Sequence, residues 1–244
     1  MPSQEDHSVR ATVKPTTSDH IPYTTEDQEP RQYEYNLRFK VKALELLSGL
    51  DKPAAQLSVL DFGSGRGEFL QMLRADGFDC VGVDFDPVCV ELSSRFAPSY
   101  QAGIDNVQQV FAGRKFDVVT CLHVLEHLEN PRQAVEILKS LTHQWLIFAV
   151  PNLAIPIALA RKQIKEVNRG HYQGWDAGHF QNLLENKCDL RIERWIPDVV
   201  ILPKVSRLAE SFSVRRWLEY RWLPRQFPFL STSLITLCSI KPRQ

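Results

Sequence analysis

The sequence predicts a doubly wound α/β domain, and three observations carry this prediction. The 244 residues, 43% of them hydrophobic and 24% charged, can form one sizeable core and exclude collagen-like, disulfide-stapled and wholly disordered chains. Short apolar segments alternate with segments of helical spacing, which indicates a parallel sheet covered by helices on both faces. A glycine-rich turn joins the first of these strands to the helix that follows it.

The elements are predicted from the periodicity of the apolar residues. A first helix is expected between residues 35 and 47, because Gly49 suits its C-terminal cap. Strands are expected at Leu57–Asp61, Cys80–Asp84, Tyr100–Ala102, Phe116–Leu122, Trp145–Val150, within Leu190–Leu202 and at Ser233–Ile240. Helices are expected at Glu68–Ala75, from Pro87 onward, at Pro131–Leu141 and at Ala177–Asn186.

The domain organisation follows from where this alternation is absent. Residues 1–30 contain six apolar residues, none adjacent to another, so we expect a mobile tail rather than a signal peptide. Residues 31–244 form the predicted domain, with cap insertions at about 153–178 and 203–231. No apolar run is long enough to span a membrane. Five scattered cysteines without a CxxC pair favour free thiols in a reducing cytoplasm.

The most informative segment is VLDFGSGRGEFL at residues 59–70. Gly63, Gly65 and Gly67 allow a tight backbone turn and the close approach of a ligand. The start of the following helix offers N–H groups and a positive dipole end, which suit a carboxylate or a phosphate. A dinucleotide fingerprint needs its third glycine where Glu68 stands. This spacing argues against a nicotinamide cofactor.

A second candidate ligand-binding acid is Asp84, which ends the strand CVGVD. It lies about 20 residues after the first glycine, where an acid can accept hydrogen bonds from both ribose hydroxyls. Hydrogen bonds to a charged group contribute about 1.5–3 kcal/mol each. The alternative is a solvated turn acid, since Asp86-Pro87 follows. We favour the ribose interpretation because the apolar strand and its acid accompany the glycine turn.

Four segments carry a family resemblance: LDFGSGRG, GVDFDP, FDVVTCLHVLEHLENP (116–131) and VPN (150–152). In this order and spacing they resemble the motifs of the class I S-adenosylmethionine-dependent methyltransferases, from about Val59 to Asn152 and more weakly to the C-terminus. The chain is most similar to small single-domain enzymes, including quinone-biosynthesis and cell-surface-glycan methyltransferases. It departs from them in lacking Pro-Gly-Gly ahead of the fifth strand. The resemblance implies a Rossmann-like sheet of seven strands with an antiparallel last strand and helical cap insertions.

The resemblance also implies which residues bind the cofactor. Asp61, Gly63 and Gly65 would hold the methionine part of S-adenosylmethionine, with Gly67 close by at the helix start. S-adenosylhomocysteine would be the product that remains there after transfer.

Further cofactor contacts are implied beyond the glycine turn. Asp84 would hold the ribose, Phe85 would pack against the adenine, and Asp105 would hydrogen-bond the adenine amino group. Three residues at the end of the fourth strand would line the pocket near the sulfonium: Cys121, Leu122 and His123.

Histidines are the candidate catalytic bases. Methyl transfer from a sulfonium is an in-line displacement, and positioning alone can supply about 7–11 kcal/mol. A hydroxyl acceptor also benefits from a base, for which we select His127 and His123, on one face of HVLEH if that segment is helical. A structural hydrogen bond is the alternative for His127.

No metal site is predicted, because HVLEH is not the HExxH pattern of metalloproteases. For His179, near His171, a role at the start of the following helix is favoured.

Both cap insertions are basic and apolar, which suggests two interpretations. One is a lid over the acceptor pocket; the other is an amphipathic surface that contacts an anionic membrane and fits a quinone-like acceptor. We favour the lid because each apolar face is short. The zero net charge and the absence of a recognition module exclude nucleic acid as an expected partner.

We therefore expect an S-adenosylmethionine-dependent methyltransferase that O-methylates a small or lipid-linked acceptor. The alternatives are a non-catalytic cofactor-binding scaffold of the same fold and a nicotinamide-dependent oxidoreductase. The intact acids Asp61 and Asp84 argue against the scaffold, and Glu68 argues against the oxidoreductase. The expected location is the cytoplasm or the inner membrane surface.

Overall fold

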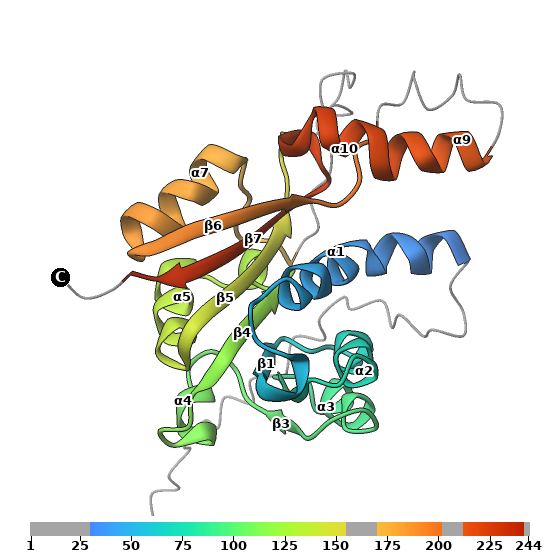
Figure 1. Cartoon of the computed structure of the whole chain (residues 1–244). Helices are drawn as coiled ribbons and strands as arrows, with labels where there is room; N and C mark the ends of the chain where they lie inside the picture. The colour runs from blue at the N-terminus through green and yellow to red at the C-terminus, as the bar shows by residue number, and fades with distance from the viewer. Residues whose placement is uncertain (1–29, 155–169, 202–211, 242–244) are drawn as a thin grey trace, which may run out of the picture.

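A seven-stranded sheet forms the centre of the molecule in the computed structural model, which describes residues 30–154, 170–201 and 212–241 (Figure 1). The strand order is β3-β2-β1-β4-β5-β7-β6; β7 pairs antiparallel with β5 and with β6, and the other pairs are parallel. This confirms the predicted doubly wound sheet with an antiparallel last strand. The strands are β1 (Ser58–Phe62), β2 (Asp79–Asp84), β3 (Ser99–Gln101), β4 (Phe116–Leu122), β5 (Thr142–Pro151), β6 (Leu190–Pro197) and β7 (Ser233–Ile240).

Helices cover both faces of the sheet (Figure 1). Leu46 of the first helix and Phe69 of the second pack into one core layer, whereas Leu138 and Phe180 pack into the other. The described α-helices are α1 (Pro30–Ser48), α2 (Glu68–Ala75), α3 (Pro87–Ser93), α4 (Val107–Phe111), α5 (Pro131–Ser140), α7 (Ala177–Gln181), α9 (Phe212–Trp217) and α10 (Leu223–Gln226). No described helix is long and apolar enough to cross a membrane.

The burial of both faces of the sheet explains why apolar residues occupy successive positions in the central strands instead of alternating with polar ones. Val118 and Val119 are neighbours on β4, and both are fully buried, but they belong to opposite core layers. Because successive side chains of a strand point to opposite faces, a central strand that is covered on both sides needs apolar residues at every position.

The predicted bounds of α2, β4 and β7 agree with the structure, whereas α1 begins about five residues before its predicted start and β5 begins three residues before its predicted start. Short and irregular elements differ as well. The helix expected at Ala177–Asn186 is α-helical only to Gln181 and continues in wider π-type turns to Lys187. The short helix α4 was not predicted, because its five residues are too few to show a helical period.

The segment HVLEH is not one helix. His123 has φ +56°, outside any helix, and a 3-10 turn follows at Leu125–His127. The two histidines therefore do not share a helical face, contrary to that expectation. The left-handed backbone at His123 reverses the chain directly after β4 and prevents a helix from starting there.

Two predicted segments fall largely outside the described residues. All but the last residue of the predicted tail at 1–30, and most of the first cap insertion, from 155 to 169, belong to the parts that the structure leaves out. Pro30 is the first residue of α1. The second insertion is described from residue 212, where α9 and α10 form. Both domain boundaries stay predictions.

Candidate cofactor and acceptor site

The glycine turn lies where the strand order reverses, between the carboxyl ends of β1 and β4, which is the usual ligand crevice of an open α/β sheet. Gly63, Gly65 and Gly67 all have positive φ, at +76°, +55° and +89°. A Cβ on Gly63 would lie 2.2 Å from Cγ2 of Val124, whereas a Cβ on Gly65 would meet no described atom within 4 Å. Gly63 is therefore required by packing, and Gly65 faces open space.

Asp61 is buried at the end of β1, with 3% of its surface exposed. Its Oδ1 accepts a hydrogen bond of 2.7 Å from the hydroxyl of Thr120 on β4. Burial raises the pKa of Asp61 to about 6, although the Thr120 hydrogen bond and the charge of Lys40 oppose the shift. An ionised Asp61 is thus costly in this position, and a ligand cation would stabilise it.

Asp84 holds the glycine turn against β2. Its Oδ2 accepts from the backbone N–H of Gly65 at 2.8 Å, and its Oδ1 accepts from that of Asp86 at 3.0 Å. A carboxylate has about four acceptor positions, so both oxygens keep capacity for a further donor. Burial raises the pKa of Asp84, against these two backbone hydrogen bonds.

The residues implied to contact adenine lie beyond β2 and β3. Phe85, directly after Asp84, is 63% exposed and is the most exposed phenylalanine among the described side chains. Asp105 is exposed in the turn between β3 and α4. Both residues lie at the carboxyl-end side of the sheet, where the implied roles require them.

The three residues implied near the sulfonium differ in their surroundings. Cys121 is fully buried in one core layer, and Leu122 is buried in the other. Burial raises the pKa of the Cys121 thiol well above its usual value. The Cys121 thiol therefore lies inside the core and is not exposed to the crevice. His123 stands beyond the end of β4, with a side chain that is 21% exposed.

The ring of His123 contacts three other side chains. Its Nδ1 lies 3.3 Å from Oε1 of Glu126, and its Nε2 lies 3.0 Å from the hydroxyl of Ser233 on β7. Its ring packs against that of Phe39 of α1, with a centroid separation of 4.1 Å and an interplanar angle of 35°. Since both ring nitrogens already have partners, neither is free to take a proton from a substrate in this arrangement.

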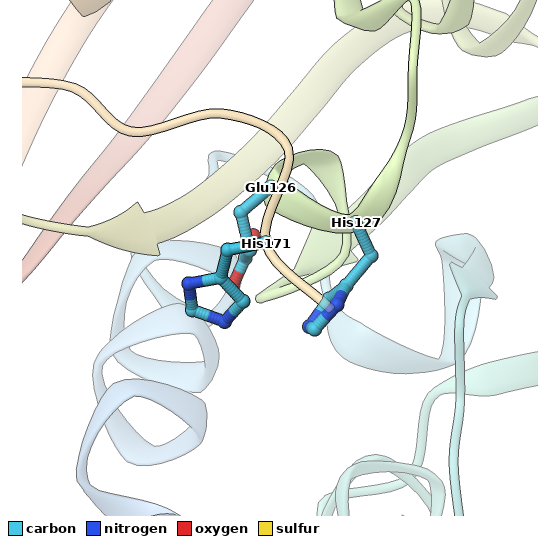
Figure 2. Close-up of side chains that lie close together, drawn as sticks. All are labelled: Glu126, His127 and His171. Atoms are coloured by element: carbon cyan, nitrogen blue, oxygen red, sulfur yellow. The ribbon is translucent and has the colours of Figure 1, made fainter. Parts of the chain in front are cut away.

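A second group of side chains gathers next to this histidine. Figure 2 shows Glu126 and His127 from the 3-10 turn after β4 and His171 from the loop that precedes α7. One potential ligand atom from each lies within 4.8 Å of the other two. The backbone carbonyl of Glu126 accepts from the N–H of Tyr172 at 2.8 Å, which fixes the loop on the turn.

The first helix, α1, forms ion pairs with the start of α2 and with the loop after β6. Nζ of Lys40 lies 2.9 Å from Oε2 of Glu68 at the start of α2. Arg38 forms a buried ion pair of 2.9 Å with Asp198, in the loop after β6. Sequence reasoning missed Lys40, which contributes to the field at Asp61, because no local spacing links α1 to a turn more than 20 residues away.

Sequence reasoning also missed Glu126. A charged residue inside an apolar run directly after a buried strand was the available signal, since such a residue is rarely buried without a reason. Only the fold shows that Glu126 is 1% exposed. The predicted role of His179 is confirmed: its N–H donates to Asp176, the N-cap of α7, at 2.9 Å.

A protein family and several curated proteins match this sequence. Residues 30–190 match the family described as a methyltransferase domain. A ubiquinone biosynthesis O-methyltransferase from Rickettsia felis is 29% identical over 85 residues, 33% of this chain and 35% of the relative. The corresponding enzyme from Erwinia tasmaniensis is 34% identical over 84 residues, 32% of this chain and 34% of the relative. The chain thus spans about a third of the length of the curated relatives it matches.

The fold is also found among solved structures. Magnesium protoporphyrin IX methyltransferase from Synechocystis PCC 6803, crystallised with SAH, superposes with a TM-score of 0.61 over 88% of this chain and 89% of that chain. The sequences are 16% identical, so this likeness shows the fold alone. It confirms the Rossmann-like architecture expected from the sequence.

Proposed function

The chain belongs to the methyltransferase-domain family, and we propose that it transfers the methyl group of S-adenosylmethionine to a hydroxyl oxygen of a small or lipid-linked acceptor. The observation that carries the cofactor assignment is the contact of Asp84 with Gly65. One carboxylate holds the turn by accepting the Gly65 N–H at 2.8 Å and keeps acceptor capacity for a ribose. Beside it, Gly65 faces open space, with no described atom within 4 Å of the position that a Cβ would occupy.

The acids of the site suit a cationic methyl donor. Asp61 would bind the methionine part of the cofactor, whose ammonium group compensates for the cost of the buried carboxylate. Phe85 offers an exposed ring to the adenine, and Asp105 lies in the next loop. We assign these residues to the cofactor because motif and position agree.

Methyl transfer then requires alignment more than acid–base chemistry. The acceptor oxygen forms the new bond to the methyl carbon as the electron pair of the old bond passes to sulfur, which leaves as a neutral thioether. Holding the three atoms in line contributes about 7–11 kcal/mol to lowering the barrier. The glycine turn and the segment after β4 are in contact through Gly63 and Val124, so donor and acceptor sites adjoin.

Oxygen as the acceptor atom is supported by His127 and by the relatives. Nδ1 of His127 lies 3.0 Å from the carbonyl oxygen of Gly170, which only accepts, so Nδ1 carries the proton and Nε2 has its lone pair available. The matched relatives from Rickettsia and Erwinia are named as O-methyltransferases. Of the two catalytic candidates, His127 is better supported than His123, whose nitrogens both have partners.

The two alternative functions are less well supported. A degenerate scaffold has no need to keep two buried acids around an open glycine turn, each with a raised pKa. A nicotinamide cofactor needs a third glycine at the position of Glu68, whose carboxylate instead pairs with Lys40.

A contact with an anionic membrane is supported by the second cap. We define the α9–α10 surface by its exposed apolar and basic residues: Val214, Trp217, Trp222, Arg215, Arg221 and Arg225. Trp217 is 54% exposed and Trp222 is 43% exposed. Aromatic and arginine side chains together suit the interface of a bilayer that contains acidic lipids, where a lipid-linked acceptor would be found.

The proposed acceptor class is tested by methyl transfer. Full-length protein is incubated with S-adenosylmethionine labelled in its methyl group and with phenols, catechols, amines and activated carbon acids as acceptors. We expect label on a hydroxyl oxygen, and no transfer by the Asp84→Ala variant. Label only on nitrogen or carbon would contradict O-methylation.

The membrane contact is tested with vesicles. We expect the full chain to co-sediment with vesicles of phosphatidylglycerol and phosphatidylcholine but not of phosphatidylcholine alone, and the Trp217→Ala/Trp222→Ala variant to lose binding. Tyr100→Ala, an exposed aromatic on β3 at the opposite edge of the sheet, is the matched control. Equal sedimentation of all three proteins would leave the lid as the better interpretation.

A further inference from the structure

The site contains a group of three potential metal ligands, of which the proposed methyl transfer uses His127 alone. Glu126 and His127 come from the turn after β4, and His171 comes from a loop more than 40 residues later. Their ligand atoms lie within 4.8 Å of one another, and Figure 2 shows the three side chains gathered at one place. The rings of His127 and His171 meet edge to face at a centroid separation of 4.7 Å.

Glu126 supplies the independent observation that a cation belongs here. It is 1% exposed, and its Oε2 has no hydrogen-bond partner among the residues that the structure describes. Its Oε1 lies 3.3 Å from Nδ1 of His123. A buried carboxylate oxygen without a partner is costly, and buried carboxylates are normally paired or coordinate a metal.

The tautomer of His127 also fits metal binding. Because Nδ1 donates to the carbonyl of Gly170 at 3.0 Å, Nε2 is left as the nitrogen that can bind a metal. Metal-ligating histidines usually donate their other N–H to a carbonyl or carboxylate in this way, which fixes the ring. The N–H of Tyr172 holds the neighbouring loop on the carbonyl of Glu126 at 2.8 Å, so His171 is presented by a fixed backbone.

We propose that Glu126, His127 and His171 form a binding site for one divalent transition-metal ion. Two imidazoles and one carboxylate are a set that Zn²⁺ and related first-row ions accept, whereas Mg²⁺ and Ca²⁺ prefer all-oxygen sites. Three protein ligands leave at least one coordination position for another molecule, as in catalytic rather than structural zinc sites. His123, through Oε1 of Glu126, orients the carboxylate from behind.

The open position is suited to the methyl acceptor, and this part of the inference rests on the proposed function. Val124 lies between His123 and the Glu126 turn and packs on Gly63, so the ion would lie beside the cofactor crevice. A hydroxyl bound there releases its proton to solvent more readily. Its oxygen then forms the bond to the methyl carbon, and the pair of the broken S–C bond stays on sulfur. His127 would thus activate the acceptor through the ion and not by taking the proton itself.

The test is direct metal binding by the full chain without a histidine tag, after removal of metals with EDTA. Titration with ZnCl₂ is followed by calorimetry, and titration with CoCl₂ is followed by visible absorption. We expect one equivalent of either ion, with d–d bands of low-coordinate Co²⁺ and no thiolate charge-transfer band. A strong thiolate band would assign binding to cysteine and would overturn the proposal.

Variants make the assignment specific. We expect His171→Ala and Glu126→Gln to weaken Zn²⁺ binding by at least about 100-fold, more than the roughly 10–100-fold effect of losing an outer-sphere partner. His179→Ala is the matched control, because His179 also has a carboxylate, that of Asp176, 2.9 Å from its ring. It should bind Zn²⁺ like wild type. Stoichiometric binding that survives His171→Ala, or no binding by wild type, would contradict the site.

Titration of the same samples with S-adenosylhomocysteine separates this inference from the proposed function. Because Glu126 is buried, its substitution can disturb folding, so the Glu126→Gln result is used only if this variant keeps wild-type affinity for S-adenosylhomocysteine. His171→Ala, in the loop before α7, is the second variant. If Zn²⁺ fails to bind while S-adenosylhomocysteine binds, the metal site is wrong and the methyltransferase proposal stands. If S-adenosylhomocysteine also fails to bind, the proposed function fails on its own evidence.

Discussion

The proposed site has two halves, a cofactor half around the glycine turn and an acceptor half after β4, and they are built in different ways. The cofactor half is made by consecutive residues, Asp61 to Gly67 with Asp84 one strand later, and backbone geometry sets it: three positive φ angles and hydrogen bonds from N–H groups to a carboxylate. The acceptor half is made by side chains from distant segments. His123 meets Ser233 across 110 residues, and His127 meets Gly170 across 43.

This difference has a physical reason. We propose that the cofactor is bound by a tight turn and by the N–H groups at the start of the following helix. Few sequences other than glycine-rich ones can form such a turn. An acceptor is recognised by side chains, which can be exchanged without disturbing the sheet. We therefore expect substitutions in the cofactor half to be harmful for conformational reasons, and those in the acceptor half to act through lost contacts.

The largest effect is expected in the cofactor half from Asp84→Ala. Two hydrogen bonds from ribose hydroxyls to a carboxylate contribute about 1.5–3 kcal/mol each, so affinity for S-adenosylhomocysteine should fall by 100-fold or more, by roughly 3–6 kcal/mol. Asp86→Ala is the control, since Asp86 caps α3 through the N–H of Val88 at 2.9 Å. It should lose about 1 kcal/mol of stability and no cofactor affinity. Calorimetric titration of both variants measures the difference; equal affinities would refute the ribose assignment.

Two neighbouring glycines sharpen the comparison within the cofactor half. Gly63→Ala places a Cβ 2.2 Å from Val124 in a left-handed backbone, so we expect a loss of roughly 2–5 kcal/mol in the free energy of unfolding. Gly65→Ala meets open space, and only the left-handed backbone costs stability, about 1–2 kcal/mol. Its main effect should be weaker cofactor binding. Urea unfolding together with titration tests both, and a Gly65→Ala variant with intact affinity would show that the ligand does not approach there.

Asp61 links stability to pH. Burial raises its pKa from about 3.9 to about 6, so the folded state holds the proton more tightly than the unfolded state does. Stability should therefore fall as pH rises from about 4 to about 6, by roughly 3 kcal/mol, and stay lower above that range. Asp61→Asn, which keeps the size of the side chain, should match wild type near pH 4 and exceed it near pH 7.

This prediction is measured by urea unfolding of both proteins at the two pH values. If the ionised Asp61 binds the cofactor, the affinity of wild type should rise as pH increases through about 6, and Asp61→Asn should remove this rise. A variant that is less stable than wild type at neutral pH would mean that the ionised carboxylate is well compensated in the free protein.

The smallest effect is expected beside the acceptor half, at the cap of α7. Asp176→Ala removes the acceptor for the N–H of His179 and should cost about 1 kcal/mol of stability. It should leave cofactor affinity unchanged, because Asp176 lies after the loop that carries His171. Thermal unfolding measures the change, and a loss well above that of an ordinary cap would show that α7 also supports the cofactor half.

The sequence was sufficient for the sheet, and it led to the residues that we propose for the cofactor half, because both depend on local patterns. Continuous apolar strands, the spacing of Gly63, Gly65 and Gly67, and an acid at the end of the next strand are all visible without the fold. The burial of Glu126 and the approach of His171 are not, since they arise when a loop after β5 returns to the turn after β4. The left-handed backbone at His123 was not predicted either, because histidine, although enriched at positive φ, adopts it only in a small minority of its positions.

The central claim is that this crevice binds the S-adenosyl group, and calorimetric titration of the wild-type chain tests it most directly. We expect S-adenosylmethionine and S-adenosylhomocysteine to bind at one site with micromolar affinity, and NADH not to bind. Binding of NADH, or absence of binding by both S-adenosyl compounds, would contradict the role that we give to Asp84 and Gly65.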